Sequence, residues 1–98
     1  MFTGRIVGEI WATKKVPSLQ GLRLLLVEPE VYHPPHLRPH STKDLVVAAD
    51  VIGAGVGERV IVAYGHGARN ALGRGENVAV EAAVVGIVDD VELTGGGV

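Results

Sequence analysis

Short apolar runs rich in valine, separated by glycine and proline, dominate this chain of 98 residues. Seventeen residues are valine and five are isoleucine, whereas only four are aromatic. Branched side chains pack well on a pleated surface, so this composition favours strands over helices. The apolar patterning predicts five strands, at residues 2–13, 22–28, 45–50, 59–64 and 79–93.

The order of these runs predicts one small all-β domain over residues 1–93. A short helical turn is expected at residues 68–72, closed by Gly73 in the manner of a helix C-cap. Five strands, one helical turn and no alternation of strands with long helices point to a small five-stranded, OB-like β-barrel. Gly8 is expected to bend the first strand, and residues 94–98 to form a flexible tail.

Residues 29–44 differ in composition from the rest of the chain. They hold four of the five prolines and three of the four histidines, which predicts a long surface loop. Its histidines invite a metal-site interpretation, because imidazole is a common zinc ligand. We predict no metal site at His33, His36 and His40, because a proline-rich loop fixes no ligand geometry and no further ligand is clearly placed.

A glycine-rich stretch follows the third strand and suggests a phosphate-binding loop. It contains three alternating glycines, Gly53, Gly55 and Gly57. A phosphate-binding loop needs a helix after its glycines, whereas residues 59–64 are patterned as a strand. Glu58 would also place a negative charge beside a bound phosphate. We therefore interpret the stretch as a connection between strands, whose glycines supply positive φ or room for a neighbouring backbone.

The last predicted strand is apolar on both of its faces. Val80, Ala82, Val84, Gly86 and Val88 fall on one face, and Ala83, Val85 and Ile87 on the other. In a single-layer barrel, one face of a strand should be polar, because water covers it. A chain this short has little of its own with which to cover a second apolar face. The pattern therefore predicts a homo-oligomer with close contacts between small residues.

Charge and residue usage exclude several classes of protein. The net charge of −2 gives no general attraction for nucleic acid or for anionic membranes. The absence of cysteine removes disulfides and thiolate chemistry. The chain shows no signal peptide and no apolar run long enough to span a bilayer, so we expect a soluble, cytoplasmic protein. Asp89 and Asp90 are adjacent on the predicted strand and would face opposite sides, so we expect no catalytic site, no cofactor and no enzyme.

Five stretches of this sequence resemble the vertex proteins of bacterial microcompartment shells, the family found in carboxysomes and in ethanolamine- and propanediol-type compartments. They lie at residues 4–29, 47–50, 52–62, 65–69 and 81–91. The resemblance implies a cyclic homopentamer of small β-barrels that closes the five-fold corners of a polyhedral shell. Its implied partners are further copies of itself and the hexameric shell proteins, and its implied location is the shell of a compartment in the cytoplasm.

The candidate site residues fall into two sets. Small residues allow symmetric copies of a loop to approach closely, so the expected five-fold axis lies at Gly65, His66, Gly67, Ala68 and Arg69. An ordinary turn that caps a short helix remains an equal alternative for this segment. The expected subunit interface comprises Gly53, Ala54, Gly55, Glu58, Arg69, Glu81, Val85 and Ile87. Arg69 and Glu81 can form an ion pair either between subunits or within one, and the sequence leaves both open.

A binding module for single-stranded nucleic acid is the alternative function for a barrel of the OB type. Such a module needs a basic groove with aromatic side chains on which bases stack. The chain offers only four aromatic residues, and its net charge is negative. A structural assembly subunit is therefore the leading prediction.

Overall fold

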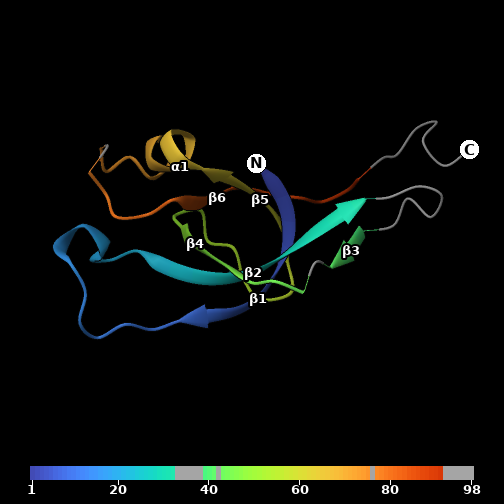
Figure 1. Ribbon diagram of the computed structural model, residues 1–98, viewed down its shortest axis with the longest axis horizontal. Coiled ribbons are helices and arrows are strands. Elements are labelled where there is room, and N and C mark those ends of the chain that lie inside the picture. The colour runs from blue at the N-terminus through green and yellow to red at the C-terminus, as the bar shows by residue number, and fades with distance from the viewer. Residues whose placement is uncertain (33–38, 42, 76, 92–98) are drawn as a thin grey trace, which may run out of the picture.

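The computed structural model describes residues 1–32, 39–41, 43–75 and 77–91. Its elements in chain order are β1 (Phe2–Ile10), the 3-10 turn η1 (Pro17–Leu19), β2 (Arg23–Tyr32), β3 (Pro39–Ser41), β4 (Val46–Asp50), β5 (Arg59–Tyr64), α1 (Gly65–Leu72) and β6 (Ala82–Ile87). The strands form one sheet, with α1 lying over its outside (Figure 1). No helix in the described part of the chain is long and apolar enough to span a membrane.

Five of the strands close into a barrel, which confirms the predicted fold class. The strand order is β1-β5-β6-β4-β2, and the pairing of β2 with β1 completes the circle. Every neighbouring pair is antiparallel except β4 and β6, which are parallel and share one register pair, Ala49 with Ala83. The register of β1 against β2 shifts between Ile6 and Gly8, which confirms the predicted bend at Gly8.

The core consists of two layers of small and branched apolar residues. The barrel interior is filled by Ile6, Leu25, Val27, Ala48, Ala54, Val60, Val62, Ala82 and Val84. A second cluster lies between the barrel wall and α1, and comprises Ala49, Ala68, Leu72, Val78 and Ala83. Small side chains in the wall let the helix approach it closely, so α1 covers part of the outer surface from within the same chain.

Glycine is required at one place in the barrel wall. A Cβ atom built on Gly4 would lie 2.7 Å from the carbonyl oxygen of Glu28 and 2.7 Å from the Cγ1 atom of Val27. Non-bonded carbon atoms favour separations of about 3.5–4.0 Å, so no larger residue fits here without moving β1 away from β2. Gly4 therefore allows β1 and β2 to approach each other closely in the wall.

The predicted loop over residues 29–44 is wrong at its start and at residues 39–41, which are strand. β2 continues to Tyr32, and its last residues pair with β3 to form a ribbon that projects from the barrel (Figure 1). Pro29 lies between the pairing of β2 with β4, which ends at Val27, and its pairing with β3, which begins at Glu30. Pro29 still pairs with Gly4 of β1, and only along its other edge does it fall in the gap between the β4 and β3 ladders. A proline at such a gap leaves the strand continuous.

The predicted bounds also change at two other strands. β1 ends at Ile10 rather than at residue 13, and β6 spans only Ala82–Ile87 rather than 79–93. Asp89 and Asp90 consequently lie beyond the end of β6. The predicted strands at 45–50 and 59–64 are confirmed to within one residue. The predicted tail at 94–98 lies outside the described residues.

Candidate assembly surfaces

The glycine-rich stretch is organised by one buried carboxylate. Asp50, at the end of β4, is only 2% exposed. Its Oδ2 atom accepts hydrogen bonds from the backbone N–H groups of Gly53 (3.0 Å) and Ala54 (3.1 Å), and its Oδ1 atom accepts one from Ile52 (3.3 Å). The loop therefore folds back over the end of its own strand, as aspartate-initiated turns do.

The conformation of this loop confirms the prediction of a glycine-dependent connection between strands. Gly53 has φ of +89° and Gly57 has φ of +94°, values that L-residues with a side chain rarely adopt. Glu58 is also used within the loop, because its Oε1 atom accepts a hydrogen bond from the N–H group of Gly55 at 2.7 Å. Ala54, a predicted interface residue, is fully buried in the barrel core of its own chain.

Sequence reasoning missed the outward side of the same loop. Val51, Ile52 and Val56 are 49%, 46% and 63% exposed, so three branched apolar side chains stand in solvent around a rigid turn. Branched apolar residues alternating with glycine were the available signal. A loop held by Asp50 presents these side chains without the ordering cost of a flexible segment.

Arg23 joins this loop to the barrel wall. Its Nη1 atom donates to Asp50 Oδ2 (2.9 Å) and to the carbonyl oxygen of Ala54 (2.8 Å), while its Nη2 atom donates to Glu9 Oε1 (2.6 Å). The hydrogen bond to Glu9, followed by the nearby negative charges of Glu9 and Asp50, raises the pKa of Arg23 despite the opposing effect of burial. The guanidinium therefore stays charged and connects β1, β2 and the loop.

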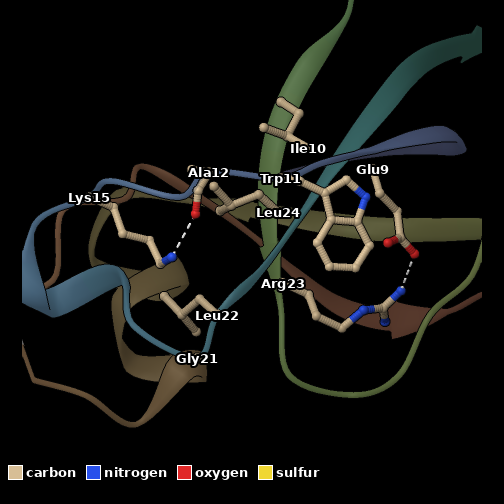
Figure 2. A pocket seen from close by; sticks show the side chains of 9 residues that line it. All are labelled: Glu9, Ile10, Trp11, Ala12, Lys15, Gly21, Leu22, Arg23 and Leu24. Carbon is tan, nitrogen blue, oxygen red and sulfur yellow. Dashed lines mark hydrogen bonds and ion pairs between the residues drawn. The ribbon is translucent and has the colours of Figure 1, made fainter.

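A pocket of about 270 Å³ opens beside Arg23 (Figure 2). Leu22 and Leu24 contribute apolar surface to it, and Lys15 donates from Nζ to the carbonyl oxygen of Ala12 at 2.7 Å on one side. The indole of Trp11 lies on the opposite side, near the Glu9–Arg23 ion pair (Figure 2). Trp11 is 87% exposed, which is unusual for the largest apolar side chain of a small domain.

The predicted five-fold-axis segment forms the first turns of α1. The helix begins at Gly65 rather than at residue 68, and Gly73 ends it with φ of +68°, which confirms the predicted C-cap. His66 is exposed and its Nε2 atom lies 3.0 Å from Asn70 Nδ2. Ala68 is fully buried against the barrel wall and cannot line an opening in this conformation.

The ion pair between Arg69 and Glu81 forms within one chain in this structure. Arg69 Nη1 lies 2.9 Å from Glu81 Oε1, and the Glu81 side chain is 82% exposed. This geometry matches the intrachain alternative. The pair ties α1 to the segment that leads into β6, close to the hydrogen bond from Gly65 N–H to the Glu81 carbonyl oxygen at 2.8 Å.

The outer face of β6 is only partly covered. The second apolar face predicted for this strand holds Ala83, Val85 and Ile87. Ala83 is fully buried beneath α1, so the chain does cover one end of that face itself. Val85 and Ile87 remain 37% and 38% exposed at the other end. These two predicted interface residues are therefore available for contact with another molecule.

The histidine-rich segment lies largely outside the described residues. His33 and His36 fall there, and His40 is placed only as a backbone position in β3. Among the residues that the structure does describe, no three histidine, cysteine or acidic side chains come together in a way that would hold a metal ion.

This small closed barrel presents exposed apolar side chains at three places: the glycine-rich loop, the β1–β2 connection and the outer face of β6. Such surfaces are typical of a subunit that assembles with other molecules. The family model described as "Ethanolamine utilisation protein EutN/carboxysome" matches residues 1–89. The chain belongs to this EutN/CcmL family.

Relatives and solved structures agree with this assignment over nearly the full chain. The sequence is 44% identical over 89 residues to the microcompartment shell vertex protein PduN of Salmonella typhimurium, covering 91% of this chain and 96% of that one. It is 42% identical over 92 residues to the microcompartment shell vertex protein GrpN of Rhodospirillum rubrum, covering 94% of this chain and 97% of that one. The solved structure of GrpN, described as a pentameric microcompartment shell protein, superposes on this structure with a TM-score of 0.77 and 39% sequence identity. The match covers 95% of this chain and 99% of that one.

Proposed function

We propose that this chain is a structural subunit of a bacterial microcompartment shell, and that it assembles as a homopentamer at the five-fold vertices. The observation that carries the proposal is the family match across residues 1–89 together with relatives named as shell vertex proteins. Surplus apolar surface on a rigid barrel supports self-association independently, because Val51, Ile52, Val56 and Val85 are all more than a third exposed.

The five-fold axis is proposed at the N-terminal turn of α1, and the subunit interface at the glycine-rich loop and the outer face of β6. Gly65, His66 and Gly67 are the axis residues whose positions suit this role, because they lie at the exposed or half-exposed start of the helix. All of the predicted interface residues except Ala54 stand at least partly in solvent.

The proposed partners outside the pentamer are hexameric shell proteins, and the proposed role is geometric. A flat hexagonal layer closes into a polyhedron only when five-fold units supply curvature, so the subunit needs no catalytic group. We expect no nucleic-acid partner, because two of the four aromatic rings, those of Phe2 and Tyr64, lie 5.3 Å apart and pack against each other rather than forming an open stacking surface.

The absolute mass of the purified chain tests the proposal. Light scattering after size exclusion should give one species near 51 kDa, five times the chain mass of 10.2 kDa. Co-expression with a hexameric shell protein of the same compartment should then give closed polyhedra in electron micrographs, whereas the hexamer alone gives open sheets or tubes. A stable monomer or dimer at micromolar concentration would contradict the pentamer.

A further inference from the structure

The connection between β1 and β2, residues 11–22, carries exposed apolar side chains that the proposed pentamer interface does not use. We call it the arm. It carries Trp11 at 87% exposure and Val16 at 53% exposure, with η1 at its far end. Hydrogen bonds hold it against the loop after α1: Arg74 Nη1 donates to the carbonyl oxygens of Ser18 and Gln20, and Ser18 Oγ accepts from Ala79 N–H at 3.2 Å.

The arm is positively charged. It contains Lys14 and Lys15 and no acidic residue. Arg74 adds a third cation, because its guanidinium donates hydrogen bonds to the backbone of the arm. Trp11 stands at the base of this surface, beside the pocket of about 270 Å³ (Figure 2). Tryptophan and arginine are enriched among the few residues that contribute most of the binding energy at protein interfaces.

The outer face of β6 is complementary to the arm. Val85 and Ile87 supply exposed branched apolar surface, and the exposed carboxylates of Asp89 and Asp90 follow directly after the strand. The two surfaces thus have opposite charge beside an apolar centre. A closed ring of identical chains needs two different, mutually complementary patches on each chain, because each subunit contacts the next in the same sense.

We propose that, in the assembled ring, the arm of one copy packs on the outer β6 face of the next, with Trp11 as the anchor of that contact. This inference rests on the proposed pentamer and assigns it a specific pair of surfaces. Trp11 is seated on Val85 and Ile87 of the neighbouring copy, and Lys14 and Lys15 lie toward its acidic residues. The charge pairs fix which way each subunit faces its neighbour and contribute little to the affinity.

Trp11 is the only tryptophan in the chain, so tryptophan fluorescence reports the surroundings of this side chain alone. The purified full chain should show an emission maximum shifted to shorter wavelength, and acrylamide quenching several-fold weaker than that of a peptide spanning residues 8–16. Dilution that dissociates the ring should move both readings to those of the peptide. Trp11→Ala should weaken ring assembly by on the order of thirtyfold, as loss of an interface hot spot does, and Trp11→Phe should retain most of it.

Charge exchange tests the pairing of the two surfaces. K14E/K15E and D89K/D90K should each weaken assembly by roughly fivefold per charge pair at low salt, and the chain that carries all four substitutions should recover it. Circular dichroism should be unchanged throughout, because all four side chains lie at the surface.

The outcomes separate this inference from the pentamer itself. A 51 kDa ring whose tryptophan stays fully quenchable would overturn the arm contact and leave the pentamer intact. Burial of Trp11 only after a hexameric shell protein is added would overturn it as well, since the arm would then face that partner. A chain that stays monomeric would overturn both.

Discussion

The carboxylate of Asp50 should be the most sensitive single group in the barrel outside the apolar core. Replacement by alanine removes the acceptor for two well-placed backbone N–H groups, those of Gly53 and Ala54, and leaves the Ala54 donor buried without a partner. It also removes the carboxylate from Arg23, which lies 2.9 Å away. Hydrogen bonds to a charged group contribute about 1.5–3 kcal/mol each, so the loss of the two backbone bonds costs at least about 3 kcal/mol.

This cost is large relative to the stability of a small domain. Chains of this length have unfolding free energies of about 5–15 kcal/mol. With a shift of about 4–8 °C for each kcal/mol, Asp50→Ala should lower the thermal midpoint by at least about 12 °C. Asp50→Asn should lower the free energy of unfolding by only about 1–2 kcal/mol, because an amide oxygen in place of Oδ2 keeps the bonds to Gly53 and Ala54 and loses the charge.

Thermal unfolding followed by circular dichroism checks the expectation, with all variants at one chain concentration because assembly itself raises the midpoint. Asp44→Ala is the matched control, since it removes an equal charge from an exposed position before β4 that lies outside the proposed contacts between subunits. If Asp50→Ala unfolds within about 3 °C of the control, less than the shift for 1 kcal/mol, the carboxylate does not hold the loop and the reasoning fails.

Four further substitutions test the roles of other groups by the same thermal assay. Gly4→Ala should destabilise by about 1–3 kcal/mol, because its Cβ would lie 2.7 Å from the Glu28 carbonyl oxygen; an unchanged midpoint would show that the strands separate freely. Gly57→Ala should cost about 1–3 kcal/mol because of its φ of +94°. Gly55→Ala should cost less, since Gly55 has no positive φ and its Cβ would have ordinary contacts; equal losses at both would argue against backbone strain. Arg69→Ala should change stability by at most about 1 kcal/mol, because its carboxylate partner is largely exposed; a larger loss in the assembled form alone would place the pair between subunits.

The barrel could be predicted because the hydrophobic pattern of most strands is visible within the strand's own residues. Residues 59–63 alternate between buried and half-buried positions, and 46–49 are a continuous apolar run, so composition and period were sufficient. The ribbon of β2 and β3 was missed because proline was taken to exclude strands. A proline breaks a strand only where a neighbouring strand needs the N–H group that proline lacks. Which strand lies beside it depends on residues far away in the sequence.

The surfaces of the barrel depended more on long-range contacts. The sequence placed an apolar second face on β6, but it did not show that α1 begins at Gly65 and covers Ala83. Asp50 was visible directly before the glycines, and an aspartate there favours a turn. Its second partner, Arg23, lies 27 residues away, and no local pattern connects the two.

The parallel contact between β4 and β6 determines how the barrel closes. Every other junction of the wall is a multi-residue antiparallel ladder, whereas this one has a single register pair, Ala49 with Ala83. Cut at this junction, the wall becomes a continuous antiparallel sheet in the order β4-β2-β1-β5-β6. Apolar packing of α1 across both alanines then replaces the missing ladder. The helix therefore holds the two edges of the rolled sheet together. We expect the pairing of β4 with β6 to be the last step of folding. The backbone amide hydrogens of Ala49 and Ala83 should exchange with solvent whenever α1 detaches from the barrel wall.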